Sequence, residues 1–238
     1  MVLTKQIKDW HKILLDTNVI CALFLSEKPG VTDPQTLFIA RLIAYLAKNK
    51  TSDGQDRIFY ISAITISELL TREQNSDKIK RILRVLYSKH VEFIDFHLNA
   101  ALELNAQLHP HLSKNKLHEK ALEIGFSEGE LVMAREWITR DYMIIMSGVS
   151  KNCDVVLTGD KKTFYPICKD VKRIDCVLTY PELFNESEQY ILRYCDDKVD
   201  DFLKPKKEAK PAGKPVPAAQ PDTTKVQRAE PESPTNKA

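Results

Sequence analysis

Lys12-Ile13-Leu14-Leu15-Asp16-Thr17-Asn18-Val19-Ile20 is an apolar run that Asp-Thr-Asn interrupts and that then resumes. Ile13 to Leu15 predict a short buried strand, because consecutive apolar residues lack the spacing of an amphipathic helix. Val19 to Leu25 predict the helix that follows. Asp16 therefore falls where a parallel strand ends, which is where open α/β sheets bind ligands. Asp16 also suits a helix N-cap, so this stretch alone leaves both roles open.

Strands and helices alternate along the rest of the chain. Further apolar runs predict strands, and amphipathic or apolar segments predict helices. Strands are expected at 58–61, 91–95, 153–157 and 173–177, and helices at 35–48, after Ser62, after Ser76, at 97–108, at 127–148 and at 181–194. Ser127 and Glu130 form the S-x-x-E pattern of a capping box before the longest helix. The alternation predicts an α/β fold with a central, mostly parallel sheet.

Composition divides the 238 residues into two parts at about Lys204. The segment 204–238 holds seven of the twelve prolines and no aromatic residue, so it cannot bury enough surface to fold. We expect a folded domain at 1–203 and a disordered Pro/Lys-rich tail at 204–238. The tail carries a formal charge of +4, which leaves −2 on the domain, because the whole chain carries +2.

The cysteines and the apolar segments indicate a cytoplasmic protein outside membranes. The five cysteines are odd in number and form no C-x-x-C pair, which is typical of reduced, cytosolic proteins. Cys21, Cys153 and Cys176 lie in apolar segments and are expected to be small core residues. The chain shows no signal-peptide pattern and no apolar run near the ~20 residues that span a bilayer.

Four acids stand at informative positions, and Asp141 is the most telling. It lies within a stripe at helical spacing that we expect to be buried: Ala134, Trp137, Ile138, Ile145 and Gly148. A carboxylate on a buried face is unfavourable by several kcal/mol, on the order of 2–7, unless it is paired or bound to metal. Asp141 is therefore a metal ligand, the partner of a buried arginine, or a residue at the rim near the helix end.

Asp160 and Glu68 complete the set of acids with Asp16 and Asp141. Asp160 follows a predicted strand, where an ordinary Gly-Asp turn is the alternative. Glu68 lies on a predicted helix, where a solvated side chain is the alternative. Oxygen ligands from carboxylates are those that Mg²⁺ and Mn²⁺ prefer, and four converging acids repel one another unless a cation or raised pKa values compensate.

Four blocks of the sequence resemble the signature blocks of the PIN-domain nuclease family, and they occur in that family's order. The blocks are LLDTNV at 14–19, ISELL at 66–70, RDYMI at 140–144 and LTGDKKTF at 157–164. The resemblance covers about Ile13 to Leu183. It implies a Rossmann-like, three-layer α/β/α fold and hydrolysis of RNA phosphodiester bonds that depends on Mg²⁺ or Mn²⁺.

Carried over to this chain, the resemblance makes Asp16, Glu68, Asp141 and Asp160 the catalytic, metal-binding acids. Asn18 and Thr158 match the polar residues that orient those carboxylates. Many small family members are toxins of bacterial toxin–antitoxin pairs, so the implied partners are RNA and an antitoxin or other protein inhibitor. A homodimer is also considered. This chain is longer than the compact toxins, mainly at 26–56 and 99–128.

A different class of function stays open beside the ribonuclease. The alternative is a catalytically inactive PIN-fold module that binds RNA or protein. Arg140, Lys161 and Lys162 adjoin two of the acids and are candidates for phosphate contacts at the rim of the site. The spacing of His109, His111 and His118 matches no standard zinc site, and the chain has no Gly-rich phosphate loop.

Overall fold

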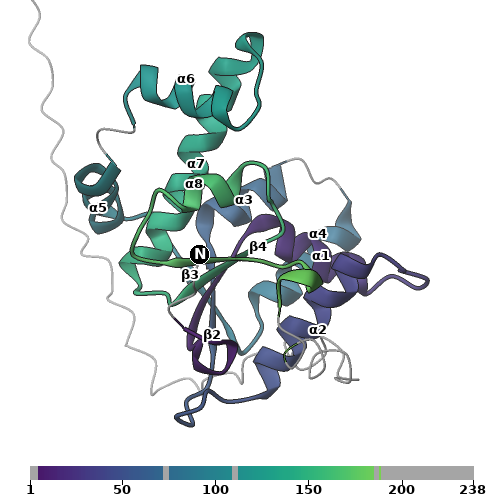
Figure 1. Cartoon of the computed structure of the whole chain (residues 1–238). Helices are drawn as coiled ribbons and strands as arrows, with labels where there is room; N and C mark the ends of the chain where they lie inside the picture. Colours follow the sequence, from purple (N-terminus) through teal and green to yellow (C-terminus); the bar gives the residue numbers. More distant parts are fainter. Residues whose placement is uncertain (1–4, 72–74, 109–111, 185–187, 189–238) are drawn as a thin grey trace, which may run out of the picture. The chain divides into compact units, whose positions relative to one another are not determined.

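A single five-stranded sheet forms the centre of the fold (Figure 1) within residues 5–71, 75–108, 112–184 and 188, which this computed structural model describes. Every pair of neighbouring strands is parallel. The strands are β1 (Lys12–Leu15), β2 (Ile58–Ser62), β3 (Val91–Ile94), β4 (Val155–Thr158) and β5 (Asp175–Leu178). The α/β fold with a parallel central sheet, predicted from the alternation of elements, is confirmed.

Helices connect each strand to the next. They are α1 (Thr17–Ser26), α2 (Pro34–Lys48), α3 (Ala63–Thr71), α4 (Ser76–Leu86), α5 (Leu98–Leu108), α6 (Lys114–Glu123), α7 (Leu131–Ser150) and α8 (Phe164–Cys168). Short 3₁₀ turns lie at Ile7–Asp9, Glu128–Glu130 and Pro181–Leu183. No helix among the described residues is long and apolar enough to cross a membrane.

The strand order β3-β2-β1-β4-β5 places β1 beside β4, although about 140 residues separate them in the sequence. The chain builds β2 and β3 on one side of β1 and then returns to add β4 and β5 on the other. Parallel sheets bind ligands at the carboxyl ends of their strands, in the crevice where the strand order reverses. That crevice lies between β1 and β4, the strands followed by Asp16 and by Asp160.

Alternating residues of the strands face two separate cores. Ile13 and Leu15 belong to the core covered by α1, α2 and α4, whereas Leu14 belongs to the core covered by α5, α6, α7 and α8. Figure 1 shows α1 and α2 on one side of the strands and α7 on the other. These three layers bury both faces of the sheet, as an all-parallel sheet requires.

Helix α7 packs unusually close to β1 because of Gly148. A Cβ atom at Gly148 would lie 2.8 Å from Leu14 Cδ2 and 3.3 Å from Ile174 Cδ1. Asp141 lies two turns before Gly148 on the same helix, since an α-helix has 3.6 residues per turn. Gly148 therefore sets how closely the C-terminal part of α7, the helix that carries Asp141, approaches the side chains of Leu14 and Ile174.

Local sequence patterns predicted most of the helices and strands, but several predicted caps and helix bounds are corrected by the structure. The capping box of Ser127 and Glu130 is present, but α4 is capped by Asn75 instead of Ser76, and its amide oxygen accepts from two backbone N–H groups. Helices α6 and α8 were not predicted, because α6 is mostly polar and α8 has only five residues. The expected helix at 181–194 begins as a 3₁₀ turn, and most of it lies outside the described residues, as does the tail at 204–238.

Two residues expected in the core are exposed. Trp137 is 41% exposed, so the buried stripe of α7 is narrower than predicted, although Ala134, Ile138 and Ile145 are buried. Cys21 is exposed, whereas Cys153 and Cys176 are buried as expected. Both errors arise because apolar spacing shows which residues share a helix face, not whether another element covers that face.

Candidate active site

Asp16 is the first residue after β1 and the N-cap of α1. Its Oδ1 accepts a hydrogen bond of 2.6 Å from the Thr17 backbone N–H, and its Oδ2 accepts one of 2.7 Å from the Thr158 hydroxyl. Its own backbone N–H donates to the Leu157 carbonyl at 3.1 Å. The N-cap role and a place at the strand ends were alternatives from the sequence, but the structure combines them. Asp16 is 4% exposed and is held both by β4 and by the first residue of α1.

The loop after β4 is tied to α1 by Asn18. Asn18 Oδ1 accepts from the Gly159 backbone N–H at 2.6 Å, and a Cβ at position 159 would lie 3.2 Å from that oxygen. The Thr158 hydroxyl, which donates to Asp16, accepts from the Asp160 backbone N–H at 2.9 Å. Asn18 and Thr158 thus tie the two strand ends together, Thr158 through the Asp16 carboxylate and Asn18 through the Gly159 backbone.

Asp160 caps the turn that begins α8. Its Oδ1 accepts from the backbone N–H groups of Lys162 and Thr163, each at 2.8 Å, and its Oδ2 accepts from the Thr163 hydroxyl. The turn that sequence reasoning offered as the alternative is therefore present. Its carboxylate charge nevertheless acts on both Asp16 and Asp141, so the capping role does not remove Asp160 from the acid group.

Glu68 reaches the same place from α3. Its Oε2 accepts a 2.5 Å hydrogen bond from the hydroxyl of Thr17, the residue after Asp16. The side chain is half-buried, so the default expectation of a solvated helix glutamate is wrong. Thr65 lies one turn earlier on α3 and is fully buried, and its hydroxyl has no hydrogen-bond partner among the described residues.

Asp141 comes from α7 and has no partner for its charge. Within the described residues, no hydrogen-bond donor or cation contacts its carboxylate, so the buried arginine considered from the sequence is not found there. The residue as a whole is half-buried. Burial of the carboxyl group raises the pKa of Asp141 well above its ordinary range, and the charges of Asp16, Glu68 and Asp160 raise it further.

The four acids form one electrostatic group, which we call the acid cluster: Asp16, Glu68, Asp141 and Asp160. Burial raises the pKa of Asp16 to about 7 from its ordinary value of 3.8, and the charges of Asp160 and Glu68 add to this. The hydrogen bonds from Thr158 and Thr17 act in the opposite direction, because they favour the ionised carboxylate. An acid cluster with such pKa values is typical of functional sites.

The acid cluster fits a hard divalent cation that is held by one or two carboxylates, not one that is enclosed by protein ligands. Within the described residues, no three His, Cys, Asp or Glu side chains lie close enough to hold a metal ion together. Mg²⁺ is usually held by one or two carboxylates, with waters and substrate phosphates as its other ligands. The all-oxygen donors, the partnerless Asp141 carboxylate and the partnerless Thr65 hydroxyl fit that arrangement, but they do not form a closed protein cage.

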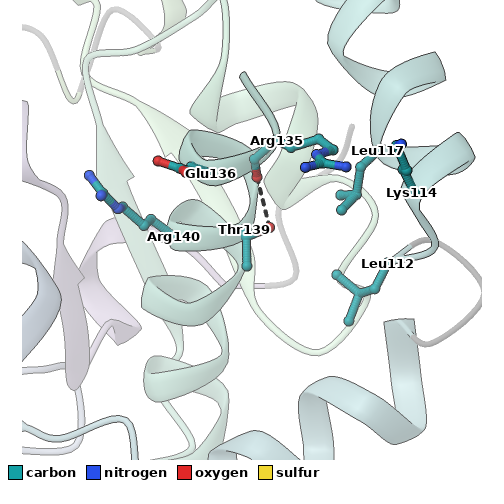
Figure 2. Close-up of a pocket in the computed structure, with 7 residues that line it drawn as sticks. All are labelled: Leu112, Lys114, Leu117, Arg135, Glu136, Thr139 and Arg140. Atoms are coloured by element: carbon teal, nitrogen blue, oxygen red, sulfur yellow. Dashed lines mark hydrogen bonds between the residues drawn. The ribbon is translucent and has the colours of Figure 1, made fainter. Parts of the chain in front are cut away.

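The three basic residues expected at the rim of the site lie in two different places. Lys161 and Lys162 are exposed in the turn that Asp160 caps. Arg140 lines a different cavity, of about 460 Å³, between α6 and α7. Figure 2 shows Arg135 and Thr139 on the side of α7 that faces Leu117, whereas the Arg140 side chain extends away from it.

Sequence reasoning missed Thr17 as a member of the site, and it did not single out the buried Thr65. Thr17 stands inside the opening Asp-Thr-Asn stretch, where its hydroxyl links α1 to Glu68. Thr65 precedes Glu68 by three residues, a spacing that places both on one face of α3. That spacing is visible in the sequence, but the direction in which the face points is not.

Comparisons with known proteins give a distant structural likeness. No family model matches the chain, and no curated protein matches it. One similar structure is a chain of "Crystal structure of VapBC2 from Rickettsia felis bound to a DNA fragment from their promoter". The likeness covers 70% of this chain and 98% of that chain, with 15% sequence identity and a TM-score of 0.44.

Proposed function

We propose that this chain is a PIN-type endoribonuclease that hydrolyses RNA phosphodiester bonds and depends on Mg²⁺ or Mn²⁺. The observation that carries the proposal is the Asp141 carboxylate, which feels the charges of three other acids and has no donor or cation among the described residues. Like charges held together in a protein are unfavourable unless they are protonated or neutralised by a cation. RNA as the substrate rests on the four sequence blocks that resemble the PIN family.

The residues of the cluster divide into rigid and adaptable donors. Asp16 is held by two hydrogen bonds and would present a fixed carboxylate, whereas Asp141 is free to meet a cation without breaking an existing bond. Thr158 and Asn18 hold the strand ends that set this geometry. A bound divalent cation would neutralise the acids, polarise a phosphodiester and lower the pKa of an attacking water.

Cleavage and metal binding by matched variants test the proposal. The wild-type protein should cleave a single-stranded RNA oligonucleotide in Mn²⁺ and not in EDTA. Asp16→Asn and Asp160→Asn should each abolish cleavage while the protein remains folded, because each removes a ligand charge with little change in volume. Asp56→Asn is the control, since Asp56 is an exposed acid on a loop. Full activity in either cluster variant would contradict the proposal.

An inactive PIN-fold module that binds RNA or protein is the second candidate. The observation in its favour is that no three metal-binding side chains converge among the described residues. Calorimetric titration with Mn²⁺ separates the two functions. The ribonuclease should bind Mn²⁺ and lose that binding in Asp141→Asn, whereas an inactive module should bind RNA without cleaving it in any divalent cation. Copurification and light scattering would test the expected inhibitor and homodimer under either function.

A further inference from the structure

A groove beside the acid cluster has no role in the function proposed so far. It has a volume of about 530 Å³ and lies between α1, α3 and α4. We call it the α1–α4 groove, and its lining residues are Thr17, Cys21, Phe24, Leu25, Lys28, Glu68, Leu69, Lys78, Arg81 and Ile82. Thr17 and Glu68 belong to the active-site hydrogen bond described above, so the groove begins at the acid cluster.

The groove follows one face of α1 away from the acids. Its α1 residues span Thr17 to Leu25, which corresponds to about 12 Å of helix at 1.5 Å per residue, and Lys28 follows the end of α1. Phe24, Leu69 and Ile82 give it an apolar wall from three helices, and Ile82 is buried whereas Phe24 and Leu69 are half-buried. The groove is therefore an apolar surface that remains open directly beside charged residues.

Positive charges border this apolar surface. Lys28, Lys78 and Arg81 line the groove, against one acid, Glu68, which lies at its active-site end. The charge of Lys78 acts on the thiol of Cys21, which places that charge beside the groove. Glu27 pairs with Arg81 at 3.9 Å and with Arg84 at 3.4 Å, so α1 and α4 are joined along the groove.

Phe24 is the one aromatic side chain among the described residues that line the groove. Proteins bind single-stranded nucleic acid with bases stacked on aromatic rings and phosphates beside cations. We propose that the α1–α4 groove binds a base and the adjoining phosphates of single-stranded RNA, next to the scissile phosphate. This proposal rests on the proposed ribonuclease function. The cavity between α6 and α7 is a weaker candidate, because none of the four acids lines it. A protein segment is the other occupant of such a surface, but two lysines and an arginine against a single acid among the described lining residues favour a polyanion.

Cys21 reports occupancy of the groove without any mutation. It is exposed and lines the groove, whereas Cys153, Cys168 and Cys176 are buried. Burial of the thiol group raises the pKa of Cys21, so labelling with N-ethylmaleimide belongs at alkaline pH. The full chain is labelled in EDTA with and without a single-stranded RNA oligonucleotide, and peptide mass spectrometry separates Cys21 from Cys195. RNA should slow Cys21 labelling several-fold, and an unchanged rate at saturating RNA would overturn the proposal.

Two substitutions separate the contribution of the base from that of the phosphates. Phe24→Leu keeps an apolar side chain but removes the ring, and should weaken RNA binding at least about fivefold while leaving inorganic polyphosphate binding unchanged. Lys78→Ala should weaken both and lower the slope of log K against log salt by about 0.7. The controls are Phe93→Leu, an exposed phenylalanine on β3, and Lys80→Ala, an exposed lysine of α4.

The outcomes distinguish this proposal from the proposed function. If the protein cleaves RNA, but Phe24→Leu and Lys78→Ala weaken RNA binding no more than their controls do, the proposal for the groove is wrong and the proposed ribonuclease function is retained. Protection of Cys21 with both expected losses, but no cleavage in any divalent cation, would support the groove and contradict the ribonuclease. A melting temperature for each variant accompanies the binding data. If a variant does not fold, protection of Cys21 by RNA in the wild-type protein tests the proposal without it.

Discussion

The raised pKa of Asp16 predicts that this carboxyl destabilises the metal-free folded protein at neutral pH relative to acid. A carboxyl whose pKa is higher in the folded state binds its proton more tightly there than in the unfolded chain. The free energy of unfolding therefore falls as the pH rises from the ordinary value of 3.8 to about 7. Each pKa unit is about 1.4 kcal/mol, so ionising Asp16 destabilises the folded protein by about 4 kcal/mol at pH ~7.5.

Asp16→Asn isolates this contribution because it removes the charge and keeps the volume. The amide can accept from only one of the two donors, Thr17 N–H and the Thr158 hydroxyl, so one hydrogen bond worth about 1 kcal/mol is lost. In EDTA at neutral pH, the variant should therefore be more stable than the wild type by roughly 3 kcal/mol, the difference of the two effects. Near pH ~4 the gain should vanish and the variant should be slightly less stable.

Urea denaturation in EDTA at a series of pH values measures the difference between the two proteins. The matched control is Asp33→Asn, which changes the exposed N-cap of α2. Hydrogen bonds from Thr36 lower the pKa of Asp33, so its variant should lose stability at neutral pH and recover it in acid, the opposite sign. If the free energy of unfolding of Asp16→Asn changed with pH in the same way as that of the wild type, burial would not raise the pKa of Asp16, and the prediction would be wrong.

Three further predictions concern other parts of the chain. Asp141→Asn should raise the melting temperature in EDTA at neutral pH, because the removed charge has no partner among the described residues; a loss of ~3–5 kcal/mol would instead reveal a buried ion pair. Gly148→Ala should destabilise the protein by about 1–3 kcal/mol in urea denaturation, because its Cβ would meet Leu14 at 2.8 Å; unchanged stability would mean that α7 can move away from β1. Truncation after Leu203 should leave folding and cleavage intact and flatten the salt dependence of RNA binding, whereas parallel salt slopes would make the tail a spacer.

Much of the chain could be assigned from local rules. The run Ile13–Leu15 and the polar residues after it predict β1 and the start of α1, because both depend only on neighbouring residues. The same holds for the capping box before α7. The four acids could also be selected from the sequence, because each stands at an element boundary or on a helix face where a charge requires an explanation.

Local rules failed where another element decides the environment. Trp137 and Cys21 have the spacing of buried residues, yet no described element covers them fully. The polar helix α6 has only two buried residues, Leu117 and Ala121, so its apolar pattern is too weak to predict a helix. Asp160 could not be assigned as a turn cap or as a member of the acid cluster, and the structure makes it both.

The sequence by itself predicted the α/β alternation and most of the caps, because hydrophobic period and capping chemistry act over a few residues, and it singled out four candidate acids. Only the tertiary structure decided that β1 lies beside β4, which brings Asp16 and Asp160 to one crevice. It also decided that Asp141 faces acids instead of an arginine among the described residues, and that a basic, partly apolar groove adjoins Glu68. Strand order and helix packing depend on contacts between residues far apart in the sequence, and no local pattern encodes which of those residues will meet.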